Sequence, residues 1–148
     1  MGAEQLITSG TQNVEIKLKS LVDIAGQNFI VTGAAKGIGL AISSLFNSLG
    51  AKVSGWDLDD SGMKNNPVFA DSQIVDVTNP LQTKEGFAAS FAALGDIDGV
   101  IANAGVNGPT KPLWDYSLSE WQMVMSVDLT GVFLTCLLYT SPSPRDDL

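Results

Sequence analysis

The sequence predicts an α/β fold in which a doubly wound parallel sheet carries helices on both faces. Two observations predict it. Short apolar segments alternate with amphipathic ones between residues 25 and 135, as strands alternate with helices in such folds. A glycine-rich segment, residues 32–39 (Thr-Gly-Ala-Ala-Lys-Gly-Ile-Gly), joins the first apolar segment to the first amphipathic one. We expect the sheet to stop after a fourth strand and the helix that follows it.

The elements can be justified in chain order. Four segments that are rich in apolar residues have the length of strands: residues 28–32, 51–56, 73–77 and 98–102. Residues 38–49 have helical apolar spacing, and Gly50 is a suitable helix terminator. Pro80 stands where a proline starts a second helix. Ser117 and Glu120 form a capping box that predicts a third helix running towards Leu134.

The composition restricts the function classes. The 148 residues carry a net charge of −8 without a basic stripe, which argues against nucleic acid or an anionic membrane as partner. No uninterrupted apolar stretch is long enough to span a bilayer, and the first residues lack the pattern of a signal peptide. The single cysteine, Cys136, allows no disulfide within the chain, so we expect a cytoplasmic protein. No metal site is expected.

The glycine-rich segment predicts a site for the pyrophosphate of a dinucleotide. Glycines let the backbone approach the phosphates, and the free N–H groups at the start of the following helix stabilise negative charge. The alternative is a tight turn between strand and helix. The candidate cofactor-binding residues of this segment are Gly33, Ala35, Lys36, Gly37, Ile38 and Gly39.

An acidic residue follows the second predicted strand. Asp57 lies 24 positions after Gly33, near the spacing at which a carboxylate reaches the adenosine ribose. A carboxylate there accepts hydrogen bonds from ribose hydroxyls and repels a 2′-phosphate, which favours NAD over NADP. Lys36 favours NADP because a cation there could pair with that phosphate. Asp57 and its neighbour Leu58 are candidate cofactor-binding residues, although Asp57 could also be a solvated loop acid.

Two further segments end predicted strands. Asp76 and Val77 follow the third strand and could recognise the edge of an adenine ring, or Asp76 could cap the next helix. Asn103, Ala104 and Gly105 follow the fourth strand, at the sheet edge where open α/β sheets bind ligands. Gly105 would let a nicotinamide ribose approach, or the three residues could simply form a turn.

These motifs resemble the N-terminal half of a classical short-chain dehydrogenase/reductase, a family with a Rossmann-type fold. The family's T-G-x-x-x-G-x-G matches residues 32–39, its strand-two acid matches Asp57, and its D-V pair matches residues 76–77. The N-A-G part of its N-N-A-G motif matches residues 103–105, and V-N-L-T-G matches residues 127–131. The resemblance covers roughly residues 25–135.

The resemblance implies an oxidoreductase that transfers a hydride between NAD and a carbonyl or alcohol substrate, with a homodimeric or homotetrameric parent. Family members use a Tyr, a Lys four positions later and a Ser. Here Tyr116 is followed at that spacing by Glu120, and Tyr139 by Ser143. The family's Ser, Tyr and Lys lie beyond the helix that starts near Ser117, so we expect this chain to be an inactive fragment.

The sequence departs from the family pattern at two positions. Ala102 replaces the first Asn of N-N-A-G. Asp128 stands where the family has a catalytic Asn whose main-chain carbonyl holds a proton-relay water, so Asp128 is the single candidate catalytic residue. The loop 106–113, with Trp114 behind it, resembles those of 3-oxoacyl-carrier-protein reductases and sugar or polyol dehydrogenases, and is expected to border the substrate pocket.

The chain divides into three predicted segments. Residues 1–24 are expected to be an N-terminal extension, and residues 25–135 an incomplete NAD-binding domain. From Cys136 the sequence resembles a translated sequencing-library adapter, so residues 136–148 are expected to be a non-native tail. Because an unpaired apolar strand edge promotes aggregation, we expect the chain to be unstable or to aggregate.

Two alternatives to an enzyme fragment of this family remain. One is a non-enzymatic short form that binds a nucleotide, or a partner through its last helix. The other is another Rossmann-like class such as a methyltransferase, against which Asp57 and residues 103–105 argue.

Overall fold

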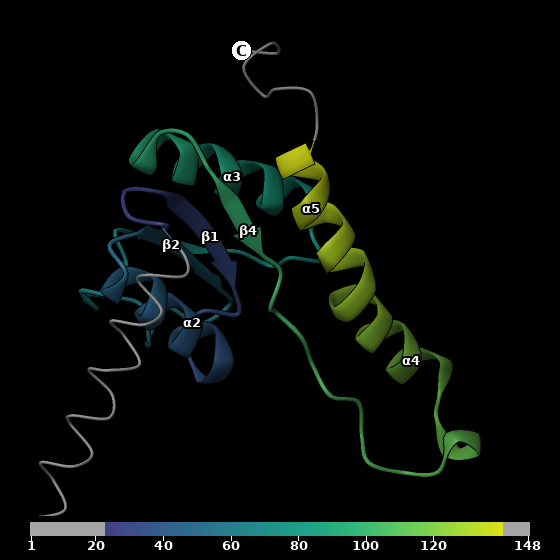
Figure 1. Ribbon diagram of the computed structural model, residues 1–148. Helices are drawn as coiled ribbons and strands as arrows, with labels where there is room; N and C mark the ends of the chain where they lie inside the picture. Colours follow the sequence, from purple (N-terminus) through teal and green to yellow (C-terminus); the bar gives the residue numbers. More distant parts are fainter. Residues whose placement is uncertain (1–22, 141–148) are drawn as a thin grey trace, which may run out of the picture.

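The computed structural model describes residues 23–140, which form a parallel sheet with helices on both faces (Figure 1). The four strands are β1 (Asn28–Thr32), β2 (Lys52–Asp57), β3 (Asp71–Ile74) and β4 (Gly99–Ile101). Their order in the sheet is β3-β2-β1-β4 and every pairing is parallel. This confirms the predicted α/β, Rossmann-type class. Residues 1–22 and 141–148, which belong to the predicted extension and tail, lie outside the described residues.

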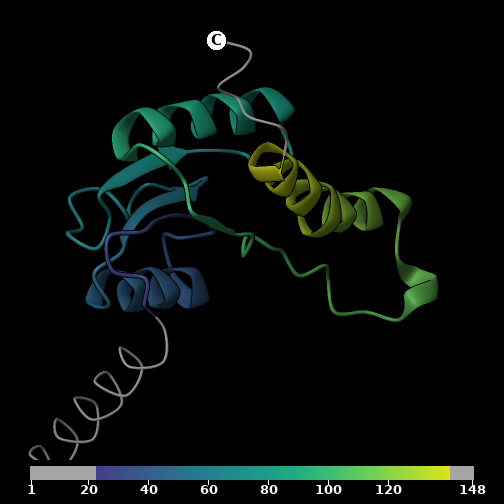
Figure 2. The same cartoon turned by 45° about the horizontal axis from the view of Figure 1, so that its top comes forward.

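Helices cover both faces of the sheet. The helix α2 (Gly37–Ser48) contacts β1 and β2 on one face, whereas α3 (Pro80–Leu94) and α5 (Val132–Thr140) contact each other and the sheet on the other face (Figure 2). A short 3₁₀ turn (Leu113–Asp115) and the helix α4 (Leu118–Met125) lie between β4 and α5. A π-helical turn, η2 (Ser126–Gly131), joins α4 to α5.

The alternation of side chains along β1 supplies a core on each side of the sheet. Val31 packs with Val53 and Met63 in the layer beneath α2. Its neighbour Ile30 points to the opposite face and packs with Trp56 in the layer beneath α3 and α5. Both β1 residues have no exposed surface, so burying each contributes about 1.5–3 kcal/mol.

The strand order places the site. From β1 the chain proceeds outward through β2 to β3, and then returns across the sheet to β4 on the other side of β1. The connections therefore leave the carboxyl ends of β1 and β4 in opposite directions, which creates a crevice where open α/β sheets bind their ligands.

Two predicted helix starts are confirmed. In α3, Pro80 occupies the first turn, and the N-cap is Asn79, whose side-chain oxygen accepts hydrogen bonds from two backbone N–H groups. In α4, Ser117 and Glu120 make both hydrogen bonds of the capping box. The third strand, however, is paired over Asp71–Ile74 and not over residues 73–77, because β2 ends at Asp57, the partner of Ile74.

The helix predicted to run towards Leu134 continues to Thr140. Leu138 packs against the cluster around Ile30 and Trp56, and the Tyr139 hydroxyl donates to the Asp98 carbonyl at 2.7 Å, so both contacts hold the extra turn. Within the described residues, the continuous helix Leu118–Thr140 is long and apolar enough by length and composition to cross a membrane, as core helices of soluble proteins also can be. Its apolar sequence is interrupted by two acidic residues, Glu120 and Asp128.

Candidate functional site

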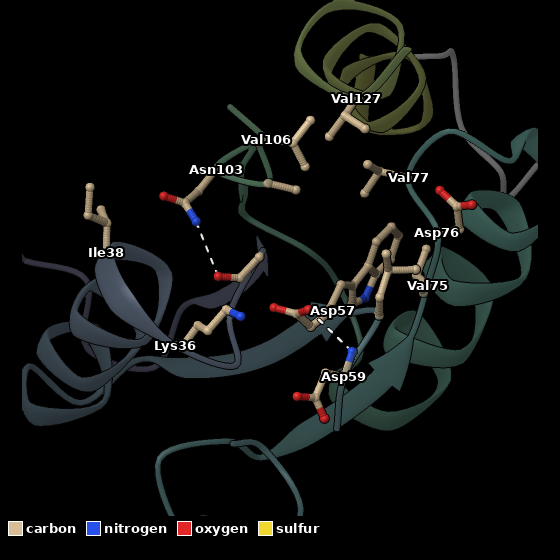
Figure 3. A pocket seen from close by; sticks show the side chains of 15 residues that line it. Lys36, Ile38, Asp57, Asp59, Val75, Asp76, Val77, Asn103, Val106 and Val127 are labelled. Atoms are coloured by element: carbon tan, nitrogen blue, oxygen red, sulfur yellow. Dashed lines mark hydrogen bonds between the residues drawn. The ribbon is translucent and has the colours of Figure 1, made fainter. Parts of the chain in front are cut away.

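A cleft of about 480 Å³ lies at the carboxyl edge of the sheet (Figure 3). It collects residues from the ends of all four strands and from η2. The predicted site residues that line it are Gly33, Lys36, Ile38, Asp57, Leu58, Asp76, Val77, Asn103, Ala104 and Gly105. The cleft is also lined by Trp56, Asp59, Val75, Val127 and Val106, the last of which belongs to the loop 106–113 expected to border the substrate pocket.

The glycine-rich loop is packed tightly against the segment after β4. Gly33 has a φ of +65°, and a Cβ there would lie 2.9 Å from the Ala104 Cα atom. A Cβ on Gly39 would overlap the Gly33 carbonyl oxygen and lie 2.7 Å from the Asn103 Nδ2 atom. These two glycines therefore allow backbone segments of the protein itself to approach each other. Gly39, Gly37 and Ala35 do not line the cleft.

Asn103 uses its side chain within the protein. Its Nδ2 atom donates to the carbonyl oxygens of Thr32 at 2.9 Å and Gly33 at 3.3 Å. In return, the buried Thr32 hydroxyl accepts the backbone N–H groups of Asn103 and Ala104 at 3.0 and 2.9 Å. These four bonds join the loops that follow β1 and β4, so Asn103 shapes the cleft through the position of both loops.

Asp57 is held at the end of β2 by two backbone donors. The Ala35 N–H donates to its Oδ2 atom at 3.0 Å, and the Asp59 N–H donates to its Oδ1 atom at 3.3 Å. A carboxylate has about four lone-pair positions, so each oxygen keeps acceptor capacity. The carboxylate is therefore oriented beside the glycine-rich loop and is able to accept further hydrogen bonds.

The start of α2 leaves its backbone donors free of a side-chain cap. Lys36 is the N-cap residue, and its side chain makes no capping hydrogen bond. Figure 3 shows Lys36 near Asp57 at one end of the cleft, with Val106 and Val127 at the other end. The positive end of the helix dipole therefore lies beside the cleft, where it favours an anionic group.

Asp76 does not cap α3, because Asn79 does. The Asp76 Oδ1 atom accepts from the backbone N–H and the hydroxyl of Thr78, at 2.9 and 2.7 Å. The Asp76 N–H donates to the Gln82 Oε1 atom at 2.8 Å. The turn after β3 is thereby fixed, with Asp76 and Val77 at the cleft.

Asp128 lies in the π-helical turn and reaches the loop after β4. Its Oδ1 atom accepts the Val106 N–H at 2.9 Å. A Cβ on Gly105 would stand 3.4 Å from the same oxygen, which is an ordinary van der Waals contact. Asp128 is itself absent from the cleft lining, whereas its neighbour Val127 is part of it. The Asp128 side chain thus positions the loop, and π-helical turns often occur at functional sites.

Further contacts fasten the middle of the loop, residues 106–117. The Lys111 ammonium lies 2.7 Å from the Glu120 carboxylate in α4, and 5.4 Å from the centroid of the Tyr116 ring. The Tyr116 hydroxyl donates to the Pro109 carbonyl. Hydrogen bonds from Lys111 and Ser117 lower the pKa of Glu120 to about 2.

The sequence of the chain matches a known protein family over most of its length. Residues 27–142 match the family described as short chain dehydrogenase. The chain belongs to the short-chain dehydrogenase family. This confirms the resemblance drawn from the motifs, and it removes the methyltransferase alternative.

Curated relatives in the short-chain dehydrogenase family include enzymes that are named for sugar-acid substrates. The chain is 32% identical over 112 residues to a 2-dehydro-3-deoxy-L-rhamnonate dehydrogenase (NAD(+)) from a Sphingomonas species, covering 74% of this chain and 45% of the relative. It is 32% identical over 120 residues to gluconate 5-dehydrogenase from Gluconobacter oxydans, covering 76% of this chain and 46% of the relative. The chain thus spans about half the length of the curated relatives it matches.

Solved structures of short-chain dehydrogenases share the fold. One from Burkholderia phymatum in complex with NAD is 27% identical, with a TM-score of 0.74 over 80% of this chain and 44% of that one. A 3-ketoacyl-(acyl-carrier-protein) reductase from Brucella melitensis, complexed with NADH, has a TM-score of 0.73 at 22% identity, covering 78% of this chain and 50% of that one. The latter likeness shows the fold alone.

The short-chain dehydrogenase motifs account for most of the cleft lining, including Val127, and Trp56, Asp59 and Val75 lie outside these motifs. Trp56 is fully buried, and its Nε1 atom donates to the Ser90 hydroxyl at 2.9 Å, so it forms part of the wall beneath α3. Its position directly before Asp57 was the available signal. Val127 opens the segment matched to V-N-L-T-G, whereas Val75 gave no chemical signal, because apolar side chains are also ordinary core residues.

Proposed function

We propose that this chain provides the NAD-binding half of an oxidoreductase that transfers a hydride between NAD and a carbonyl or alcohol substrate. The observation that carries the proposal is the orientation of Asp57 beside the glycine-rich loop, with acceptor capacity left on both oxygens. The start of α2, where Lys36 makes no capping hydrogen bond, reaches the same cleft through Lys36 and Ile38.

The residues present fit a dinucleotide. The cleft volume of about 480 Å³ falls within the range typical of cofactor sites. We assign Gly33, Lys36 and Ile38, which line the cleft, to the pyrophosphate, and we assign Gly37 and Gly39 to the shape of the loop that carries them. Asp57 is assigned to the adenosine ribose.

The adenine and the nicotinamide ribose, on opposite sides of the pyrophosphate, are assigned to the remaining strand ends. Asp76 and Val77, with Leu58 nearby, are assigned to adenine, because they offer a carboxylate, a backbone N–H and an apolar surface at one turn. Residues 103–105 are assigned to the nicotinamide ribose. When bound, nicotinamide supplies or accepts a hydride at its C4 atom.

We infer that NAD is preferred over NADP. Asp57 carries a negative charge where a 2′-phosphate of NADP would approach, and like charges repel. The name of the Sphingomonas relative includes NAD(+), which supports the same choice. Lys36 is the opposing feature, because its ammonium lines the same cleft.

We propose that the substrate is a small carbonyl or alcohol compound that enters between the loop 106–117 and the cleft. Val106 and Val127 provide an apolar border there. The Asp128–Val106 hydrogen bond holds the start of the loop, and the Lys111–Glu120 ion pair holds its middle. A sugar acid is one candidate substrate, because the two curated relatives named above act on such compounds.

The chain by itself is expected to have no catalytic activity. Its sequence contains no Tyr-x-x-x-Lys. The Tyr139 hydroxyl donates to the Asp98 carbonyl, which lies at the start of β4, whereas the cleft lies at the other end of that strand. Asp128 is retained as a positioning residue for the loop. We further propose a cytoplasmic location and a homodimeric or homotetrameric parent, to which the exposed apolar side chains of α4 and α5 would contribute.

Two measurements test the proposed function. Isothermal titration of the 148-residue chain with NAD⁺ and NADP⁺ should show binding that is tighter for NAD⁺, and an absence of binding to either compound would contradict the proposal. Sequencing of the source gene beyond the codon for Thr135 should reveal a Ser and a Tyr-x-x-x-Lys. If the gene instead ends with residues 136–148, NAD⁺ binding without turnover would favour the non-enzymatic short form.

A further inference from the structure

A second carboxylate lies at the same end of the cleft as Asp57. Asp59 follows β2 by two residues and lines the cleft together with Asp57 and Lys36. Figure 3 shows these three side chains at one end of the cleft. Because the Asp59 N–H donates to the Asp57 Oδ1 atom at 3.3 Å, the positions of the two acids are linked.

The Asp59 carboxylate is held in place by its own turn. The Ser61 N–H donates to its Oδ1 atom and the Ser61 hydroxyl to its Oδ2 atom, both at 2.9 Å. These two hydrogen bonds and the positive charge of Lys36 lower the pKa of Asp59. Asp59 is therefore fully ionised at neutral pH, although the turn is open to solvent.

We propose that Asp59 is a specificity-determining residue that excludes the 2′-phosphate of NADP by placing a second negative charge beside Lys36. This inference rests on the proposed function of the cleft as an NAD site. Lys36 alone would balance the charge of Asp57 and leave this end neutral. With Asp59 the three side chains sum to a charge of −1, so a 2′-phosphate, which carries about −1.5 to −2, is repelled.

The size of the effect follows from Coulomb's law. One unit charge acting on a doubly charged phosphate across about 6–8 Å of water-like dielectric changes an affinity about five- to tenfold. Because the turn is exposed, the effect should weaken at high ionic strength. A purely structural role of Asp59 in the turn would not discriminate between two nucleotides that differ only in the 2′-phosphate.

The test uses adenosine fragments as probes. Adenosine 5′-monophosphate and adenosine 2′,5′-bisphosphate differ by the 2′-phosphate alone and need only the adenosine end of the cleft. Dissociation constants for both are measured by isothermal titration on the native chain, on Asp59→Asn and on Asp59→Ser. The matched control is Asp60→Asn, which removes an equal charge from the same turn at a residue that does not line the cleft.

In Asp59→Asn, we expect the affinity for the bisphosphate, relative to that for the monophosphate, to rise about five- to tenfold. This rise should be smaller in 0.5 M salt, because the Debye length there is only about 4–5 Å. Asp60→Asn, at a side chain that does not line the cleft, should raise the ratio less than Asp59→Asn does. Asp59→Ser replaces Asp59→Asn if circular dichroism shows that the latter is unfolded. An unchanged ratio in a folded Asp59 variant that still binds the monophosphate overturns this inference alone. If the native chain binds neither NAD⁺ nor the monophosphate, the proposed function and this inference both fall.

Discussion

The Asp57 carboxylate accepts the backbone N–H of Ala35 at 3.0 Å, so the acid that ends β2 is bonded directly to the glycine-rich loop that follows β1. The strands β1 and β2 are neighbours in the sheet, and Thr32 is paired with Trp56. The carboxyl ends of these two strands therefore meet. The hydrogen bond connects the acidic Asp57 to the loop that carries the basic Lys36.

Replacing Asp57 with Ala should weaken NAD⁺ binding about 10- to 100-fold, because hydrogen bonds to a charged group are each worth roughly 1.5–3 kcal/mol. Isothermal titration measures the change. Glu85→Gln, which removes an exposed acid on α3, is the control and should bind NAD⁺ as the native chain does. Equal affinities for the native chain and Asp57→Ala would refute the assignment of this residue to the ribose.

Replacing Gly39 with Ala should destabilise the fold by about 2–4 kcal/mol, because the new Cβ overlaps the Gly33 carbonyl oxygen and crowds the Asn103 amide. Urea unfolding followed by circular dichroism gives the free energy of unfolding. In Gly105→Ala the nearest atom is 3.4 Å away, so that variant should lose less than about 1 kcal/mol. Similar losses in both variants would show that the close approach at Gly39 is unimportant.

Replacing Thr32 with Val should cost about 1–3 kcal/mol of stability, because the buried hydroxyl accepts the N–H groups of Asn103 and Ala104. Thr32→Ser keeps the hydroxyl and serves as the matched control. It should retain more stability than Thr32→Val when both are compared in urea. The reverse order would argue that the methyl group, and not the hydroxyl, joins the two loops.

The Glu120 carboxyl should titrate with a midpoint near pH 2 in the folded chain, against an ordinary value of 4.5. Because its folded pKa is lowered, its ion pair with Lys111 stabilises the fold fully above pH 4.5, and this contribution is lost as the pH falls from 4.5 through 2. Carbon NMR of the carboxyl group measures the midpoint. Lys111→Met should raise it, and a native midpoint above 4 would contradict the ion pair.

The 148-residue chain should self-associate through the last helix. Phe133 and Leu137 in α5 are 59% and 45% exposed, and Trp121 in α4 is 51% exposed, which leaves a large apolar surface in water. Sedimentation velocity should show concentration-dependent association that Phe133→Glu reduces. Leu81→Glu, which alters a side chain of similar exposure on α3, should have little effect. A monomer at all concentrations, with a sharp cooperative melt, would argue against the expected instability.

Local signals predicted the elements well where one short segment contains the whole signal. The capping box of Ser117 and Glu120 and the proline at the start of α3 depend on residues a few positions apart, and both are present in the structure. Local signals left the end of the last helix open, because Leu138 and Tyr139 are held by contacts with distant residues around β4 and α3. The limits of β3 likewise depend on where its partner strand β2 ends.

The sequence by itself determined the fold class, the family and the positions of Asp57, residues 76–77 and residues 103–105 at strand ends, because strand and helix periodicity and motif spacing are properties of the chain alone. Only the tertiary structure decided what those side chains contact. Asn103 bonds to Thr32 across 71 residues and Asp128 bonds to Val106 across 22, and such pairs form only once the strand order has brought β1, β4 and the last helix together. The spacing of residues along the chain carries no information about which of their atoms will meet, because that is set by packing.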